Sequence, residues 1–217
     1  MLPIGDDDRF RRTTPVVTYI LIALNIAFFL VELSSGDAFV EKWAFIPSQF
    51  MANPGREFLT LFTSMFMHAG WLHLGGNMLY LWIFGDNVED RFGHSRFLVF
   101  YLLCGLAATA AQLAFTANSS IPNLGASGAI AGVLGSYLLL FPQSTVRVLQ
   151  GQQVIPVSAL LVIGLWFVLQ LFSGIGSIVA AATGSGGVAY MAHIGGFLAG
   201  ILLTILFTGA RRLPLTA

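Results

Sequence analysis

Six apolar segments follow one another along this chain, each close to the ~20 residues that cross a bilayer core of ~30 Å as a helix. They cover approximately Val16–Leu33, Trp71–Val88, Phe97–Phe115, Ser127–Phe141, Val154–Phe172 and Gly187–Phe207. Hydrophobic residues make up 56% of the chain and charged residues only 9%, whereas about a quarter of a typical soluble domain is charged. The sequence therefore predicts an all-α, polytopic membrane protein with six transmembrane helices.

Two other interpretations of these segments are less favourable. A helical bundle in water needs a polar outer face on each helix, and residues 198–207 offer almost none. A cleaved signal peptide is a poor account of the first segment, because the apolar run is long and no convincing cleavage site follows it. We expect a retained span there. The fourth segment is short and begins in a glycine-rich stretch, which is compatible with a cavity beside it.

The basic residues predict the orientation, because Lys and Arg near span ends tend to stay cytoplasmic. With six spans, all of them except Lys42 and Arg56 fall on the side of the N-terminus. We expect a plasma (cell inner) membrane protein with both termini cytoplasmic. It would have an N-terminal tail over 1–15, a membrane domain over 16–209 and a C-terminal tail over 210–217. The amphipathic loop 34–70 would lie outside, at the membrane interface.

The first twelve residues are expected to form a disordered tail. Their acidic triplet, Asp6 to Asp8, would be solvated or would contact cytoplasmic partners. Ten basic residues balance ten acidic residues, so no net field attracts nucleic acid, and we expect none as a partner. Cys104 is the single cysteine, and no Cys/His cluster has the spacing of a zinc site. We expect neither a metal nor a cofactor.

Polar side chains within apolar spans are costly, so each is a candidate functional residue. Spans two, four and six all enter from the non-cytoplasmic side, and a single shallow cavity could hold the polar residues near their starts, which are His73, Asn77, Ser127 and His193. Asn25 and Gln170 do not fit this pattern. We expect those two side chains to form hydrogen bonds between helices.

Small residues at four-residue spacing predict close contact between spans four and six. They are Gly128, Gly132 and Ser136 on one span and Ala192, Gly196 and Gly200 on the other. Such a contact would bring Ser127 and His193 together. In the alternative interpretation the glycines serve packing only and Ser127 merely caps its helix; the spacing alone leaves both open.

Ser127 and His193 permit nucleophilic catalysis, because a serine hydroxyl needs a base and neutral histidine is the usual one. The Asn77 amide, the His73 ring and the backbone N–H of Ser127 could donate to an oxyanion. No acidic residue follows Asp90, and no earlier one is obviously placed to orient His193. We therefore expect a catalytic dyad rather than a triad.

Competing chemistries fit the same residues less well. A zinc protease would need H-E-x-x-H, but His68 and His73 have no acid between them. An aspartyl protease needs two acids within spans. A transporter or channel would need a midplane carboxylate or broken helices in two corresponding halves, and neither is apparent in the sequence.

Three motifs resemble the rhomboid family of intramembrane serine proteases. The pattern H-x4-H-x3-N followed by L-x3-G-x3-E-x3-G is present at His68, His73, Asn77, Leu81, Gly85, Glu89 and Gly93. G-x-S-G is present at Gly125, Ser127 and Gly128, and A-H-x-G-G-x3-G at Ala192, His193, Gly195, Gly196 and Gly200. The resemblance covers nearly the whole chain, and it implies a rhomboid-like bundle.

The resemblance implies a cofactor-free serine endopeptidase with Ser127 as nucleophile and His193 as general base. His73 and Asn77 would line the oxyanion site, and Glu89 would be structural. Members of the family cleave other membrane proteins in or near a transmembrane helix, usually after a small residue. The implied partners are membrane-protein substrates with helix-destabilised transmembrane segments, within a lipid bilayer. The alternative is a rhomboid-like pseudoprotease that binds membrane helices without cleavage, and the presence of both Ser127 and His193 argues against it.

The sequence departs from the family pattern at two places. Many relatives have Trp-Arg shortly before L-F-T-S, and this chain has Phe58-Leu59-Thr60 before that motif. Relatives also often carry an aromatic residue four positions after the nucleophile, packed on the histidine ring, and Ala131 stands there in this chain. The sequence leaves open how His193 is held, although Tyr190 could contribute.

Overall fold

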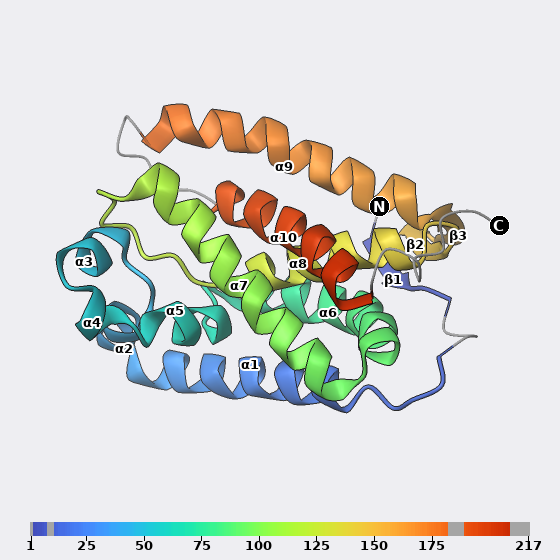
Figure 1. Ribbon diagram of the computed structural model, residues 1–217, viewed down its shortest axis with the longest axis horizontal. Coiled ribbons are helices and arrows are strands. Elements are labelled where there is room, and N and C mark those ends of the chain that lie inside the picture. The colour runs from blue at the N-terminus through green and yellow to red at the C-terminus, as the bar shows by residue number, and fades with distance from the viewer. Residues whose placement is uncertain (1, 8–10, 182–188, 209–217) are drawn as a thin grey trace.

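The structure is a computed structural model that describes residues 2–7, 11–181 and 189–208. Its longest elements are the helices α1 (Val16–Ser35), α6 (Trp71–Phe92), α7 (His94–Thr116), α8 (Ser127–Leu140), α9 (Ala159–Ala181) and α10 (Tyr190–Thr208). Figure 1 shows them as one bundle, with α1 and α9 on opposite sides. The mainly helical fold is therefore confirmed.

Three of these helices, α1, α7 and α10, are long and apolar enough to cross a membrane by length and composition. Helix α8 has only 14 residues, and α6 carries several charged residues in its last turns. Each of the six predicted spans overlaps a helix, but six spans are not confirmed. The C-terminal tail 210–217 and the first two residues of the predicted sixth span lie outside the described residues.

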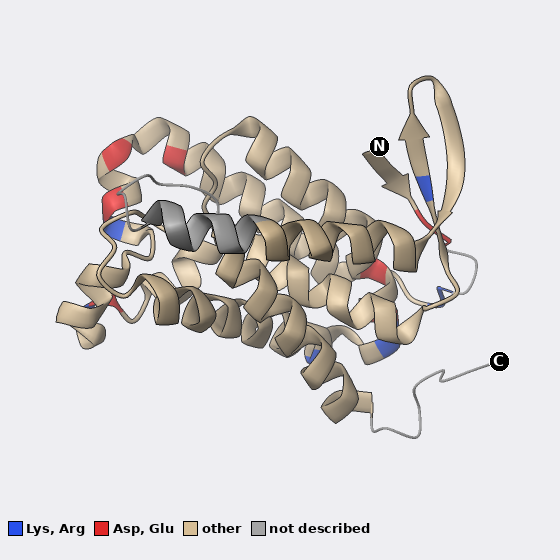
Figure 2. Cartoon of the chain, turned by 90° about the horizontal axis from the view of Figure 1, so that it is seen from above, with Lys and Arg blue, Asp and Glu red and all other residues tan. Residues whose placement is uncertain are grey.

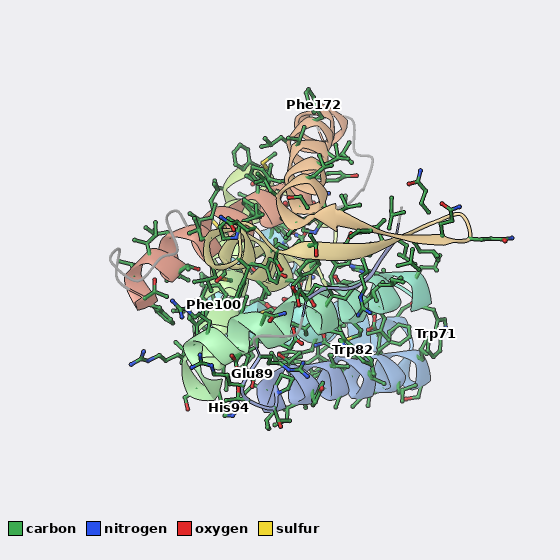
Figure 3. All side chains as sticks on the ribbon, turned by 90° about the vertical axis from the view of Figure 1, so that its right-hand side faces the viewer. Trp71, Trp82, Glu89, His94, Phe100 and Phe172 are labelled. Atoms are coloured by element: carbon green, nitrogen blue, oxygen red, sulfur yellow. The ribbon has the colours of Figure 1, made fainter. Side chains whose placement is uncertain are left out.

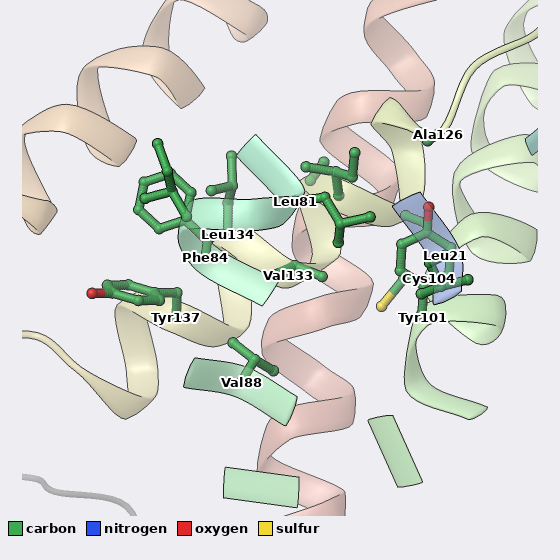
Figure 4. Close-up of a cluster of buried hydrophobic side chains, with 14 of the residues drawn as sticks. Leu21, Leu81, Phe84, Val88, Tyr101, Cys104, Ala126, Val133, Leu134 and Tyr137 are labelled. Atoms are coloured by element: carbon green, nitrogen blue, oxygen red, sulfur yellow. The ribbon is translucent and has the colours of Figure 1, made fainter. Parts of the chain in front are cut away.

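Helix α8 lies at the centre of the bundle, and most of its side chains are buried. Its apolar side chains meet those of α6 and α7 in a continuous core (Figure 4), where the fully buried residues include Leu81, Phe84, Tyr101, Cys104, Val133, Leu134 and Tyr137. Because α8 is wrapped by its neighbours, both of its ends are fixed in position. This arrangement makes the first residue of α8 a rigid point in the fold.

Helices α8 and α10 pack with their backbones almost in contact. A Cβ atom added at Gly196 would lie 2.0 Å from the carbonyl oxygen of Gly128, and one at Gly200 would lie 2.1 Å from that of Gly132. Only residues without a side chain permit this approach. The close contact predicted from the spacing of small residues is confirmed.

The outer surface of the bundle is apolar. Phe172 on α9 projects outward (Figure 3) with 71% of its surface exposed, and Trp82 on α6 is 63% exposed. Most charged residues gather instead at the two ends of the bundle (Figure 2). A belt of exposed aromatic and aliphatic side chains between two charged ends is typical of a bilayer-facing surface.

One end of the bundle carries the segment 34–70, which folds into short helices (Figure 1): α2 (Asp37–Trp43), α3 (Pro47–Ala52), α4 (Pro54–Glu57), α5 (Thr60–Thr63) and the 3-10 turn η1 (Ser64–Phe66). The backbone of Gly125, in the loop before α8, donates to the carbonyl of Ser64 at 2.9 Å. The segment is thus tied to the start of α8. Its expected position at a membrane interface stays a prediction.

The opposite end carries a three-stranded antiparallel sheet, which was not predicted. The strands β1 (Leu2–Gly5), β2 (Thr145–Gln150) and β3 (Gln153–Ser158) lie in the order β1-β2-β3. Val148 of β2 pairs with both Pro3 and Ile155. Val154 consequently belongs to a strand, and the helix predicted to begin there begins at Ala159.

The expectation of a disordered, solvated N-terminal tail is wrong for the residues described. Besides forming β1, this segment buries Asp6, whose carboxylate accepts hydrogen bonds from the Asn87 amide at 2.7 Å and the Tyr137 hydroxyl at 2.6 Å. Arg11 pairs with Asp86 at the same end. A buried carboxylate must be hydrogen-bonded to offset its lost hydration, and α6 and α8 supply the donors.

Glu89 joins the end of α6 to the start of α1. Its carboxylate accepts from the backbone N–H groups of Val17 and Thr18 and from the Thr18 hydroxyl, at 2.7–2.8 Å. His94 contacts the same carboxylate from the start of α7 (Figure 3). The first N–H groups of a helix lack acceptors within it, so Glu89 caps α1 from a neighbouring helix, which agrees with its expected structural role.

Candidate active site

Ser127 and His193 meet at the end of the bundle that carries α2 to α5. Ser127 is the first residue of α8, and His193 lies in the first turn of α10. The Ser127 Oγ and His193 Nε2 atoms are 2.7 Å apart, which is hydrogen-bond distance. The expectation that the packing of the two helices brings these side chains together is met.

A glutamine of α7 contacts the backbone at the start of α10, next to His193. The Gln112 side-chain oxygen accepts the backbone N–H of Ala192 at 3.2 Å. This N–H lies in the first turn of α10 and also donates to the Ala189 carbonyl at 3.0 Å, so Gln112 is its second acceptor. Gln112 therefore fixes the residue next to His193, while the glycine contact described above fixes the separation of α8 and α10.

His73 lies across the site from α10. Its Nδ1 atom accepts the backbone N–H of Ala69 at 3.4 Å, so a neutral ring carries its proton on Nε2. The Nε2 edge faces Gly125, whose backbone has φ +128°, and a Cβ atom there would lie 3.0 Å from Nε2 and 3.6 Å from Ser127 Oγ. Because glycine has no Cβ atom, the Nε2–H group of His73 can lie close to the Ser127 hydroxyl.

Asn77 lies one turn further along α6, 7% exposed. Its amide nitrogen is buried and has no hydrogen-bond partner among the described residues. A buried donor left without an acceptor costs about 1–3 kcal/mol, so such groups need a reason. Asn77 lines the same cavity as His73 and Ser127.

His68 precedes this group and packs edge-to-face on His73, with ring centroids 5.1 Å apart. Its ring is almost fully buried, and its backbone N–H donates to Glu32 at 3.0 Å. Burial, followed by the proximity of His73, lowers the pKa of His68 to about 4. The ring is therefore neutral at pH 7 and adds no charge beside His73.

A cavity of about 1300 Å³ connects these residues. All four predicted site residues, His73, Asn77, Ser127 and His193, line it, and Trp71, Trp166 and Leu134 are among its apolar lining. The large volume and the mainly apolar lining, with a few convergent polar groups, are typical of a site for an extended or bulky ligand. The cavity predicted beside the fourth segment is present.

The sequence left open how His193 is held, and the structure supplies the contacts. The Gln170 side-chain oxygen of α9 lies 2.7 Å from His193 Nδ1. The Trp166 ring, one turn earlier on α9, packs against the imidazole with centroids 5.9 Å apart, and Tyr190 approaches it edge-on at 6.3 Å. Gln170 bonds between helices as predicted, but the sequence did not predict that it belongs to the site. The available signal was its position four residues after Trp166, which places the two side chains on one face of a helix.

Asn25 is the other side chain that was expected to bond between helices, and it has an acceptor within its own helix. Asn25 donates its amide nitrogen to the Leu21 carbonyl of its own helix at 2.7 Å. Within the ranges that the structure describes, no group of three or more His, Cys, Asp or Glu residues could hold a metal ion.

Comparison with known proteins places this chain in a family. The sequence matches the Rhomboid domain over residues 55–210, which includes every residue of the site. The chain belongs to the rhomboid family. All three sequence motifs lie within the matched range, so the rhomboid resemblance is confirmed.

Several curated rhomboid proteins are similar to this chain. Rhomboid protease GluP of Bacillus subtilis (strain 168) is 39% identical over 131 residues, covering 59% of this chain and 25% of GluP. Rhomboid protein 1, mitochondrial, of Saccharomyces cerevisiae is 31% identical over 198 residues, covering 89% of this chain and 54% of the relative. This rhomboid chain thus spans between a quarter and about half of the length of these relatives.

The relatives contradict the expected plasma membrane location. The yeast relative is named as mitochondrial, and so is RHOMBOID-like protein 6 of Arabidopsis thaliana, which is 38% identical over 84 residues, 39% of this chain and 27% of its own. Rhomboid sequences are therefore not confined to the plasma membrane. The basic residues report only which ends of the spans share a side, and they carry no information on which membrane is spanned.

Proposed function

We propose that this rhomboid chain is an intramembrane serine endopeptidase that cleaves transmembrane or juxtamembrane segments of other membrane proteins. The observation that carries the proposal is the 2.7 Å contact between Ser127 Oγ and His193 Nε2 at the edge of a large cavity. One relative supports it by name, because GluP of Bacillus subtilis is called a rhomboid protease. Ser127 is the nucleophile, and His193 is the general base.

The reaction follows from the positions of the two side chains. His193 Nε2 takes the hydroxyl proton as Ser127 Oγ attacks the carbonyl carbon of the scissile peptide bond, forming a tetrahedral intermediate. His193 then returns the proton to the departing amine, leaving an acyl-enzyme. Water, activated by the same imidazole, attacks the ester carbonyl, releases the second product and restores the Ser127 hydroxyl.

The negative oxygen of each tetrahedral intermediate is stabilised by the donors around Ser127. These are the Nε2–H of His73, the buried amide of Asn77 and the backbone N–H of Ser127 at the positive end of α8. Donors fixed in advance stabilise developing charge without reorganisation, and losing one costs about 10²–10³-fold in rate.

All six long helices cross the bilayer in this proposal, with both termini on one side and the cavity opening on the other. Helix α6, with 22 residues, is ~33 Å long and α8 only ~21 Å. A central helix shorter than the bilayer core places Ser127 below the membrane surface, where water can enter through the cavity. The lipid bilayer itself is thus a partner of the enzyme.

The substrates are membrane-spanning segments with helix-destabilising residues. A peptide bond within a helix is closed to attack, because its carbonyl is hydrogen-bonded and its backbone is surrounded by side chains. Glycine or proline lowers the cost of unwinding by about 1–3 kcal/mol per residue. We therefore expect faster cleavage of a model transmembrane substrate that carries Gly or Pro than of one in which those residues are Leu.

The test is cleavage of such a substrate by the purified protein in liposomes, compared with Ser127→Ala and His193→Ala. The wild type should cleave, both variants should be inactive, and a fluorophosphonate probe should label only a chain that retains Ser127. Cleavage by both variants would refute the dyad. A folded wild type that neither cleaves several substrates nor reacts with the probe would favour the pseudoprotease, the alternative function.

A further inference from the structure

Gln170 contacts the imidazole of His193 on the edge opposite Ser127. The Gln170 Oε1 to His193 Nδ1 distance is 2.7 Å, equal to the distance from His193 Nε2 to Ser127 Oγ. The imidazole is therefore held between two hydrogen-bonding partners, one on α9 and one on α8. Among the residues that the structure describes, no carboxylate takes the position that an aspartate occupies in a serine protease triad.

The carbonyl oxygen of an amide side chain can only accept a hydrogen bond. Bonded to Oε1, Nδ1 must carry the proton of the neutral ring, and Nε2 is then left with a free lone pair. That lone pair faces the Ser127 hydroxyl. The contact selects the tautomer in which His193 can act as a base, and it also selects the rotation of the ring.

A second contact from the same helix restricts the ring further. Trp166 lies four residues before Gln170, hence on the same face of α9, and its ring packs against the imidazole with an interplanar angle of 37°. Trp166 packs against the imidazole at a tilt, while Gln170 contacts its Nδ1 edge. His193 belongs to α10, so both contacts cross a helix boundary, and both depend on where α9 lies.

We propose that Gln170 is the positioning residue of the dyad, a neutral amide that holds His193 in the Nδ1–H tautomer with Nε2 directed at Ser127. The inference deepens the proposed proteolytic function and rests on it for its effect on rate. The tautomer itself is a property of the folded chain and can be measured without a substrate. The two proposals can therefore fail separately.

The matched variants are Gln170→Glu, which keeps an oxygen acceptor, and Gln170→Met, which has a similar length and volume but no acceptor of comparable strength. Loss of the acceptor should lower kcat about 10–100-fold, the range seen when the partner that orients a metal-binding histidine is removed. KM should change little, because Gln170 bonds to His193 and not to the substrate. Gln170→Glu should retain most of the activity.

The structural readout is ¹⁵N NMR of the histidine side chains in the full-length protein. The chain has four histidines, and His193→Gln identifies the resonances of His193 by their loss. At a pH where the ring is neutral, the wild type and Gln170→Glu should show a protonated Nδ1 and an unprotonated Nε2. Gln170→Met should show a mixture of the two tautomers.

The control is Leu169→Met, which places the same side chain at the neighbouring exposed position of α9 and should leave both readouts unchanged. A wild-type His193 protonated at Nε2 would overturn the inference, because the Gln170 amide would then donate to Nδ1. So would a Gln170→Met enzyme with unchanged kcat and tautomer. A wild type with the expected tautomer but no proteolysis would refute the proposed function and still support the Gln170 contact.

Discussion

Asn77 and Asn87 are buried asparagines on the same helix, and their surroundings differ. Asn87 donates an amide hydrogen to Asp6 at 2.7 Å, whereas the Asn77 amide nitrogen has no acceptor among the described residues, and Asn77 lines the same cavity as Ser127. A donor that stabilises the fold is paired in the folded chain. A donor kept unpaired in a cavity is typical of a group reserved for a charge that develops during reaction.

Asn77→Ala should therefore lower kcat by about 10²-fold, because one oxyanion donor is lost, without lowering the thermal unfolding temperature. Asn87→Ala, the matched control, should lower the unfolding temperature, since it leaves buried Asp6 with one donor fewer, and should keep most of the activity. Steady-state cleavage rates and thermal unfolding in detergent measure both effects. If Asn77→Ala destabilised the chain as much as Asn87→Ala does, the amide would be structural.

The separation of α8 from α10 sets the geometry of the dyad at the scale of elements. Each helix carries one member, and the backbones touch at Gly128 and Gly196, one residue and three residues from Ser127 and His193 respectively. A change of separation at this contact is passed almost directly to the 2.7 Å distance between Ser127 and His193. The packing of α8 against α10 therefore sets the distance between Ser127 and His193.

Gly196→Ala should lower both activity and stability. The new Cβ atom would lie 2.0 Å from the Gly128 carbonyl oxygen, so the helices must move apart, at a cost of about 1–3 kcal/mol. The matched control is Gly164→Ala on α9, where a Cβ atom would meet nothing within 4 Å. Probe labelling of Ser127 and thermal unfolding test the pair, and a Gly196→Ala enzyme with wild-type labelling would contradict the expectation.

The whole molecule separates its polar groups into two ends with different tasks. The end with α2 to α5 holds the unpaired amide, the dyad and the cavity. The end with the sheet holds paired groups, where Asp6, Glu89 and Asp86 accept hydrogen bonds or ion pairs from neighbouring elements. The paired groups that stabilise the fold thus lie at the opposite end of the bundle from the dyad and the cavity.

Asp6→Ala should test this separation. It removes the shorter of two hydrogen bonds made by the Tyr137 hydroxyl and by the Asn87 amide, which keep Ser144 and Asp86 as their other acceptors. Each lost hydrogen bond costs about 0.5–1.5 kcal/mol. We expect a lower unfolding temperature and, below it, unchanged labelling of Ser127. Glu41→Ala, an exposed acid on α2, is the control and should leave the unfolding temperature unchanged. An equal effect of both substitutions would show that Asp6 is not part of the stabilising network.

The β-hairpin shows where sequence reasoning failed. Residues 145–158 contain Val146 and Val148 in alternation with Thr145 and Arg147, followed by a turn at Gly151, which is the pattern of two strands. Hydropathy averaged over a helix-length window hides an alternation of six residues. Strand β1 had no local signal of comparable strength, because four residues form a strand only when a partner edge is available.

The sequence by itself determined the positions of the long helices, the small-residue contact between α8 and α10, and the four side chains around the site. Apolar length, spacing and motif order are local properties, and a bilayer-sized helix needs no distant partner to be recognised. Only the tertiary structure decided the partner of Asp6, the role of Glu89 as a cap and the contact of Gln170 with His193. Those interactions join residues 23 to 131 positions apart, and a hydrogen bond of that kind depends on how helices are placed in space.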